Sequence, residues 1–294
     1  MAAVSQDLSV VWNNFSRIPM DIAGFDGSRS ALQPLWDGLR SFFGDEVLCS
    51  PAFPVGMAIS YYFTLCLIYM FLDLYGVKHW AWLRKYKLHQ DINVTAPQLY
   101  TTLVLTMWNH ALYIVPAGVL QYIYSPPFPL DDDAPLLTQF LWDQTISLFL
   151  FDLSYGVLHY WFHTNRWVYR AIHSVHHQYH SPFCWVTQYL HPAELIFVGA
   201  TTAIIPKMLG VHTLSYFGFQ LFNIWISVEA HCGYEFPFSL SLIVPFNIVA
   251  GPRKHDLHHM KPMSNYMPHL TWLDKLMGWE FNGYDTKKQK IATK

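Results

Sequence analysis

Residues 55–74 read VGMAISYYFTLCLIYMFLDL, and this run contains a single charged side chain, Asp73, near its end. A helix of about 20 mostly apolar residues is long enough to cross the hydrocarbon core of a bilayer, so the run predicts a transmembrane helix. The composition of the whole chain agrees with this interpretation. Of the 294 residues, 52% are hydrophobic, 17% are aromatic and only 13% are charged, whereas about a quarter of the residues in soluble domains are charged. The sequence therefore predicts an integral membrane protein.

Three more apolar segments extend this pattern: residues 98–124, 136–158 and 194–228. The first is interrupted by polar residues and a proline, and the second carries Asp143 and Asp152. The third is broken near Pro206 and Gly210, which predicts a hairpin of two helices rather than one long helix. We therefore expect an all-α fold, organised as a polytopic membrane helical bundle.

The distribution of basic residues predicts the orientation of these spans, because cytosolic loops carry an excess of Lys and Arg. Four basic residues follow the first span within residues 78–87, and two more follow the third span. The loop after the second span, SPPFPLDDDAP, has three aspartates and no basic residue. This pattern places the N-terminus in the lumen and everything after residue 158 on the cytosolic face. Asn14, in the sequon Asn-Phe-Ser, is then a candidate glycosylation site on the lumenal side.

These expectations divide the chain into four segments. They are a lumenal N-terminal segment (1–54), transmembrane helices (55–158), a histidine-box catalytic region that includes the apolar hairpin of about 194–228 (159–280), and a basic cytosolic tail (281–294). The first thirty residues have no apolar core of the kind a cleavable signal peptide has, so the first span is expected to act as a signal anchor.

Composition also excludes several classes of function. The formal net charge is only −2 and no long basic stripe is present, which argues against nucleic-acid binding. The four cysteines form no CxxC pair, so neither a disulfide framework nor a cysteine-based zinc site is expected. The sequence contains no GxGxxG or CxxCH motif and so predicts no nicotinamide or haem site of its own.

Histidine is the unusual residue, with 16 copies, and eight of them fall in three clusters. The clusters are HxxxH at 159–163, HxxHH at 173–177 and HxxHH at 255–259. Residues i, i+3 and i+4 of a helix share one face, so each cluster is expected to point its imidazoles in one direction. Eight imidazoles exceed the three or four protein ligands of one zinc ion, which predicts two metal ions. Because thiolate clusters and an HExxH motif are missing, iron with oxygen chemistry is the preferred interpretation.

This set of boxes, following several spans, resembles the fatty acid hydroxylase and sterol desaturase superfamily of membrane non-haem di-iron enzymes, over roughly residues 145–280. Other phrases look most like the cholesterol 25-hydroxylases and widen the coverage to about residues 31–280. These phrases are LQPLWDGLRS (32–41), SPAFPV (50–55), LRKYKLH (83–89), TQY (187–189), NIWISVEAHCGYEFP (223–237) and VPF (244–246). Some features depart from that subfamily: His191-Pro192 and HHMKPMSNY (258–266) look closer to 4-methyl sterol oxidases, and Lys254 stands where the family often has a further histidine.

The resemblance implies a set of metal ligands, residue by residue. They are His159, His163, His173, His176, His177, His231, His255, His258 and His259, with His191 as a weaker tenth candidate. Asp256 could orient an imidazole from behind or simply be a solvated helix position. Glu229 and Asn265 are polar neighbours of ligands that could support an imidazole from behind, but packing is the preferred interpretation for each.

The resemblance also implies the activity, which is hydroxylation of cholesterol or a related sterol at C25 by two iron ions, O2 and NAD(P)H-derived electrons. The electrons would come from a partner such as cytochrome b5 or cytochrome P450 reductase, and the compartment would be the endoplasmic reticulum membrane, with the histidine boxes as a cap on the cytosolic face. A 4-methyl sterol oxidase or a sterol desaturase would use the same boxes. A metal-binding membrane protein without catalytic activity is a remoter alternative.

Overall fold

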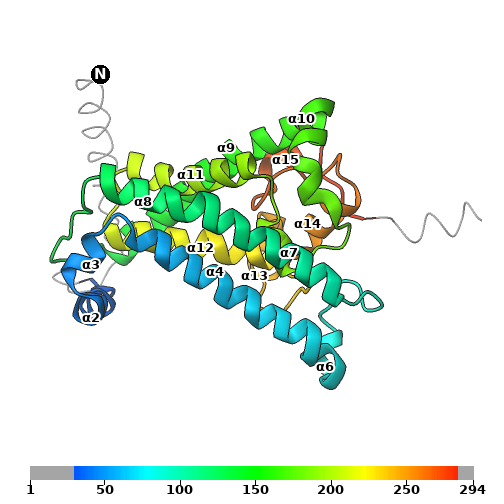
Figure 1. The fold of residues 1–294 in the computed structure, drawn as a ribbon, viewed down its shortest axis with the longest axis horizontal. Helices are drawn as coiled ribbons and strands as arrows, with labels where there is room; N and C mark the ends of the chain where they lie inside the picture. Colours follow the sequence, from blue (N-terminus) through cyan, green and yellow to red (C-terminus); the bar gives the residue numbers. More distant parts are fainter. Residues whose placement is uncertain (1–29, 284–294) are drawn as a thin grey trace, which may run out of the picture. The chain divides into compact units, whose positions relative to one another are not determined.

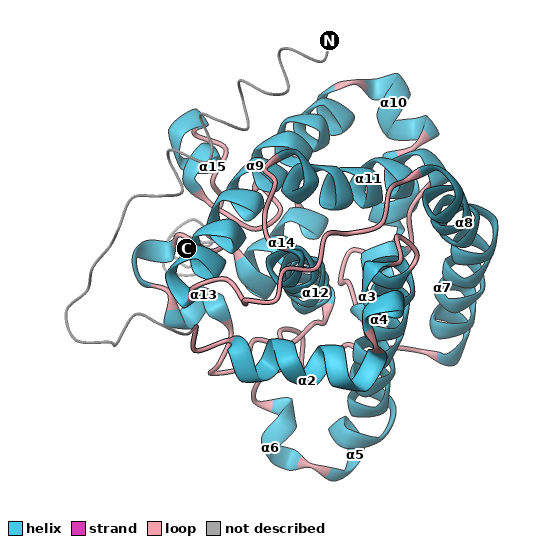
Figure 2. Cartoon of the chain, turned by 90° about the vertical axis from the view of Figure 1, so that its left-hand side faces the viewer, coloured by secondary structure: helices cyan, strands magenta, loops and turns pink. Residues whose placement is uncertain are grey.

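The computed structural model describes residues 30–283, and within this range the chain consists of helices and loops without a β-strand (Figures 1 and 2). Its only extended pairings are two isolated backbone bridges, Lys87 with Tyr234 and Val249 with Leu270. The predicted all-α class is confirmed for this part of the chain. The candidate glycosylation site at Asn14 and most of the basic tail lie outside the described residues and stay predictions.

The chain divides into two compact units whose segments alternate along the sequence. The first unit comprises the described residues of Met1–Tyr61 together with His110–Phe151 and Ile196–Ile224. The second unit comprises Tyr62–Asn109, Asp152–Leu195 and the described residues from Trp225 onward. Because all three histidine boxes belong to the second unit, that unit carries the candidate site.

The first unit contains four whole elements, α2 (Gln33–Phe43), α3 (Asp45–Cys49), η2 (His110–Ile114) and α8 (Val115–Tyr124). It also contains parts of four longer helices, α4 (Phe53–Phe71), α9 (Leu137–Thr164), α11 (Pro192–Met208) and α12 (Thr213–His231). Its core is formed by buried Trp36, Leu48, Phe128 and Phe217. The indole nitrogen of Trp36 donates to the Asp131 carbonyl at 2.8 Å, which holds the aspartate-rich loop of residues 125–135 against α2.

The region 194–228 forms two helices, α11 and α12, as its internal breaks predict. Gly210 lies between them with φ of +63°, a left-handed conformation that glycine adopts readily. The two helices are joined by side-chain hydrogen bonds, in which Gln220 donates to the Thr202 carbonyl at 2.9 Å and Asn223 donates to the Thr202 hydroxyl at 3.0 Å.

Two helical stretches, Phe53–His79 and Ala96–Tyr124, are long and apolar enough to cross a membrane. Only 17% and 22% of their most apolar windows are buried, so they do not resemble the core helices of a soluble protein. The third predicted span lies in the 28-residue helix α9, but this helix does not reach the same hydropathy. One of its charges, Asp152, accepts backbone N–H bonds from His269 and Leu270 at 2.8 and 3.1 Å.

The second unit contains the rest of the elements, most of them short. They are η1 (Leu72–Gly76), α5 (Val77–His79), α6 (Ala81–Arg84), α7 (Ala96–Asn109), α10 (Arg166–Ala171), η3 (His173–Gln178), η4 (Cys184–Gln188), α13 (Leu240–Ile243), η5 (Pro245–Asn247), α14 (Gly251–Met260) and α15 (Trp272–Met277). The boxes lie at the end of α9, in the nearby η3 and on α14, so folding brings the histidines of α14 to those of two segments much earlier in the chain.

Candidate metal centre

Nine histidines of the second unit gather into two buried groups. The five-histidine group consists of His159, His163, His173, His177 and His258, and the four-histidine group consists of His176, His231, His255 and His259. Within each group the nitrogens available as ligands lie within 4.8 Å of one another. The structure thus brings together all eight box histidines and His231, while His191 belongs to neither group.

The HxxHH boxes do not point their imidazoles in one direction, so that expectation is wrong. In the second box His173 and His177 join the five-histidine group, whereas His176 joins the four-histidine group. The third box, on α14, is divided as well: His258 joins the five-histidine group, whereas His255 and His259 join the four-histidine group. Residues i+3 and i+4 are successive positions and project about 100° apart around an α-helix, so one box can reach two centres. The second box is moreover a 3-10 helix, η3, rather than an α-helix.

Hydrogen bonds to Nδ1 orient five of the nine rings. Nδ1 of His159 lies 2.6 Å from the Tyr266 carbonyl oxygen, and Nδ1 of His258 lies 2.7 Å from the Ser264 carbonyl oxygen. Three further Nδ1 contacts have the same character: His231 to Ser227 O at 2.7 Å, His259 to Tyr179 O at 3.0 Å, and His173 to a Glu194 carboxylate oxygen at 3.0 Å. Carbonyl and carboxylate oxygens can only accept a hydrogen bond, so each Nδ1 carries the ring proton. Each Nε2 therefore keeps a lone pair that can bind a metal ion.

This tautomer assignment tests whether the residues fit a metal ion. Nε2 of His159 lies 2.9 Å from Nε2 of His173, and both rings hold their proton on the opposite nitrogen. Two lone pairs at that distance repel each other unless a cation lies between the donors. In the four-histidine group, His231 also holds its proton on Nδ1, and its Nε2 lies 2.8 Å from Nε2 of His255 and 3.2 Å from Nε2 of His176, so three ring nitrogens converge there. The donor sets therefore fit two metal ions, and imidazole suits iron as well as zinc, copper and nickel.

Burial favours the neutral form of an imidazole, which is the form that binds metals. All nine imidazoles are at most 7% exposed. Burial and neighbouring imidazoles lower the pKa of His159, His176, His177, His255, His258 and His259 well below the usual value. Burial lowers the pKa of His231 to about 4, against a partly opposing bond to the Ser227 carbonyl. Metal binding at neutral pH therefore requires no deprotonation of these residues.

Glu194 is a site residue that the sequence analysis did not identify. Its side chain is fully buried, and its Oε1 and Oε2 lie 2.8 and 3.0 Å from Nδ1 of His173. The Tyr155 hydroxyl donates to Oε1 at 2.9 Å. A carboxylate behind a ligating imidazole fixes the orientation of the ring and raises its basicity. The available signal was a single acidic residue at the start of an otherwise apolar helix.

Asn265 shapes the loop that supplies two of the carbonyls. It adopts the left-handed conformation, with φ of +51°, between Ser264 and Tyr266. Its amide nitrogen donates to the Phe281 carbonyl at 2.9 Å, and its amide oxygen accepts from the Phe281 N–H at 2.8 Å. Asn265 therefore contacts backbone rather than an imidazole, and it holds the turn whose flanking carbonyls orient His159 and His258.

The other predicted neighbours lie away from the ligand atoms. Asp256 is buried and its two oxygens lie 3.0 and 2.8 Å from Nε2 of His89, so it is not a solvated helix position and its partner is not a box imidazole. Glu229 is buried and its carboxyl is hydrogen-bonded by Ser239. Nδ1 of His191 accepts from the Ala193 N–H at 3.2 Å, at the start of α11.

Residues 144–279 match the fatty acid hydroxylase family, a stretch that contains every histidine of both groups. A cholesterol 25-hydroxylase-like protein 2 of Danio rerio is 43% identical over 249 residues, which cover 84% of this chain and 88% of that protein. A cholesterol 25-hydroxylase-like protein 1, member 2, of the same organism is 41% identical over 254 residues, covering 86% and 91%. The cholesterol 25-hydroxylase of Homo sapiens is 39% identical over 250 residues, covering 84% and 89%. No solved structure matches the chain significantly.

The helical fold, the two buried groups of imidazoles and the family match over the residues that carry them together define the class of protein. The chain belongs to the fatty acid hydroxylase family, whose members are oxidoreductases. Within this family its relatives are cholesterol 25-hydroxylases and cholesterol 25-hydroxylase-like proteins, and the resemblance found in the sequence is confirmed.

Proposed function

We propose that this chain is a membrane non-haem di-iron sterol monooxygenase that hydroxylates cholesterol or a related sterol at side-chain carbon C25. The observation that carries the proposal is the pair of buried imidazole groups, in which nine Nε2 or Nδ1 atoms converge as two donor sets. The names of the relatives support the choice of substrate, and the family supports hydroxylation.

The reaction balances as R–H + O2 + 2 electrons + 2 H⁺ → R–OH + H2O. One oxygen atom enters the C–H bond and the other leaves as water. Two iron ions, when bound, supply the redox chemistry that allows O2 to attack an unactivated C–H bond. The five-histidine group would hold one ion and the four-histidine group the other.

The protein's own residues prepare this site in two ways. The carbonyls of Tyr266 and Ser264 keep the protons of His159 and His258 on Nδ1, so that Nε2 stays free to bind. Glu194 does the same for His173 with a carboxylate, which makes that ring a stronger donor. Burial of the groups excludes bulk water and prevents protonation of the imidazoles.

The electrons must come from a partner, because the sequence has no motif for a nicotinamide, haem or iron–sulfur group. A cytochrome b5 or a cytochrome P450 reductase, driven by NAD(P)H, is the proposed donor. The two stretches long and apolar enough to cross a membrane support an endoplasmic reticulum membrane protein. The basic residues after the first span support a cytosolic face for the boxes.

The test is sterol analysis by mass spectrometry of cells that express the wild type, His258→Ala or His79→Ala. His79 is a matched control because it is a histidine that belongs to neither imidazole group. We expect 25-hydroxycholesterol with the wild type and with His79→Ala, and none with His258→Ala.

Other outcomes would assign the alternatives. Loss of 4-methyl sterols in the wild type would indicate a 4-methyl sterol oxidase, and a new ring double bond would indicate a sterol desaturase. Equal product from His258→Ala and the wild type would contradict the metal assignment. Iron bound to purified protein that changes no sterol would favour a metal-binding protein without this activity.

A further inference from the structure

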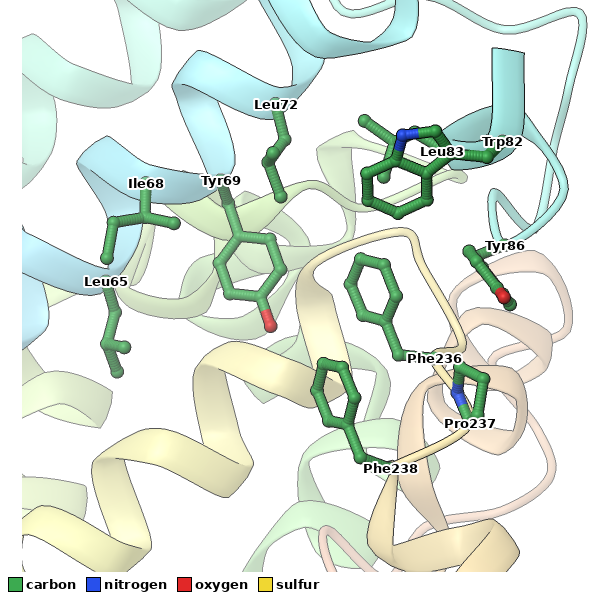
Figure 3. A pocket seen from close by; sticks show the side chains of 10 residues that line it. All are labelled: Leu65, Ile68, Tyr69, Leu72, Trp82, Leu83, Tyr86, Phe236, Pro237 and Phe238. Atoms are coloured by element: carbon green, nitrogen blue, oxygen red, sulfur yellow. The ribbon is translucent and has the colours of Figure 1, made fainter. Parts of the chain in front are cut away.

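A pocket of about 420 Å³ lies in the second unit, away from the residues that the metal site uses. One wall consists of α4 and η1, with Leu65, Ile68, Tyr69 and Leu72. In Figure 3, Tyr69 and Leu72 project from this helix toward the side on which the rings of Phe236 and Phe238 lie. The volume falls within the range of about 300–1,000 Å³ that is usual for small-molecule sites.

The lining of the pocket selects a neutral and largely apolar ligand. All ten lining residues are Leu, Ile, Pro, Phe, Tyr or Trp, so the wall carries no charged side chain. Its polar side-chain atoms are the hydroxyls of Tyr69 and Tyr86 and the indole N–H of Trp82. A free fatty acid or a phospholipid would place an ionised group against this wall without a counter-charge, which is costly. A neutral lipid with one hydroxyl, such as a sterol, meets no such cost.

The mouth of the pocket opens on the surface that a bilayer would cover. Ile68, Trp82 and Phe238 each line the pocket and are more than half exposed. Ile68 lies on the stretch Phe53–His79, which is long and apolar enough to span a membrane. Trp82 lies beyond the end of this stretch, where aromatic residues commonly mark the membrane–water interface. A lipid can therefore reach the pocket from the bilayer without crossing water.

The wall formed by residues 236–238 belongs to the same chain segment as His231, a candidate metal ligand. Tyr69 stacks on Tyr234 with ring centroids 6.4 Å apart, and Tyr234 stacks on Phe236 at 5.5 Å. Tyr234 follows His231 of the four-histidine group by three residues. The Glu235 N–H donates to the Tyr86 carbonyl at 2.8 Å, so the lining residue Tyr86 is held against the segment that carries Phe236.

We propose that this pocket binds the rigid ring body of a sterol taken from the bilayer. This inference rests on the proposed function and names where its substrate is held. The neutral lining, the opening on the apolar stretch and the shared segment with His231 are three independent observations behind it.

The test is photolabelling of the full chain in lipid nanodiscs with a photoreactive cholesterol, followed by peptide mapping. We expect label on peptides that contain residues 65–72 and 236–238, and competition by excess cholesterol. Ile68→Trp and Phe238→Trp place a larger ring in the pocket from opposite walls, and each should reduce the label about tenfold, because the indole occupies space that the sterol needs. Leu67→Trp is the matched control, since Leu67 is half exposed on the same helix but does not line the pocket.

Iron content of each variant is measured in parallel to show that it is folded. Undiminished labelling of both filled variants that bind iron normally would overturn the proposal. So would equal labelling by a photoreactive fatty acid, which carries the charge that the pocket excludes. If the wild type hydroxylates sterols and both filled variants do so at the same rate, this pocket is not the sterol site although the proposed function stands. If the wild type hydroxylates no sterol, the proposed function itself fails.

Discussion

Replacing Glu194 by glutamine isolates the contribution of one carboxylate to one metal site. Glu194 and His173 are both fully buried, and the carboxylate accepts from Nδ1 of the ring at 3.0 Å. A hydrogen bond to a charged group contributes about 1.5–3 kcal/mol, and a neutral one contributes about 0.5–1.5 kcal/mol. Glu194→Gln keeps the acceptor but removes the charge, so the expected loss is about 1–2 kcal/mol, or about 5- to 30-fold in iron affinity.

Glu194→Ala removes the acceptor as well and leaves the Tyr155 hydroxyl and the His173 N–H without this partner. The affinity should then fall about 100-fold, at the upper end of the effects seen when such outer partners of a metal ligand are removed. Only the five-histidine group contains His173, so only one of the two ions should bind more weakly.

The assay is anaerobic titration of the purified, iron-depleted chain with Fe(II) against a competing chelator, read as iron bound per chain. We expect two binding phases in each Glu194 variant, one with the wild-type affinity for Fe(II) and one with a lower affinity. Glu235→Gln is the control, because that carboxylate pairs with the exposed guanidinium of Arg253. Wild-type affinity for both ions in Glu194→Gln would refute the role assigned to the carboxylate, and equal weakening of both phases would refute its restriction to one group.

Three further predictions concern the surroundings of the site. Asn265→Ala should weaken iron binding more than Asn265→Gly. Both variants lose the hydrogen bonds of the amide, but alanine also costs about 1–2 kcal/mol in the left-handed backbone conformation. Iron titration of the two variants measures the difference in affinity. His89→Ala should lower the melting temperature by an amount equivalent to about 1–3 kcal/mol, since it leaves the buried carboxylate of Asp256 unpaired, and His89→Gln should recover part of it. Gly156→Ala should cost about 1–3 kcal/mol in thermal unfolding, because its Cβ would clash with Sδ of the buried Met267, and the double variant with Met267→Ala should lose less than the sum.

The chain offers a matched control for each of these variants. Asn247→Ala places the same strain at a left-handed asparagine, φ of +49°, whose contacts do not include the histidines, and should leave iron binding unchanged. His79→Ala removes a histidine that belongs to neither imidazole group. Gly199→Ala adds a methyl group to a helix where no atom lies within 4 Å, so it should not destabilise the fold. Equal effects in a variant and its control would contradict the local explanation.

Much of the fold was predictable because its signals are local. The long apolar runs predict the two stretches Phe53–His79 and Ala96–Tyr124, since length and hydropathy are properties of consecutive residues. The break near Gly210 predicts α11 and α12 for a similar reason, because a left-handed glycine ends a helix wherever it occurs. The third span was predicted from the same kind of signal, but α9 does not reach the hydropathy of the other two stretches, because polar residues such as Asp143 and Asp152 lower its average. Only the structure shows that Asp152 accepts from the backbone of His269, more than 100 residues away.

Eight of the nine histidines were predictable from the residues alone, because imidazole is a recognisable ligand and the HxxHH spacing repeats. His231 stands alone in the sequence, and only the family resemblance pointed to it. The count of the eight box histidines led to two metal ions, and the structure has two groups. Which histidine joins which group was not predictable from the spacing. That division depends on the directions from which η3 and α14 approach, because successive positions of one helix project to different sides and can serve two centres.

By itself, then, the sequence determined the residue types that can bind metal, the helices that carry them and the apolar runs beside them. Only the tertiary structure decided how the imidazoles are oriented. The Tyr266 carbonyl that fixes His159 lies 107 positions along the chain, and the pairing of His89 with Asp256 spans 167. Every residue has a backbone carbonyl, so no residue type marks the ones that accept from a ligand. Their role arises because folding places a particular oxygen within hydrogen-bonding distance of a particular ring nitrogen.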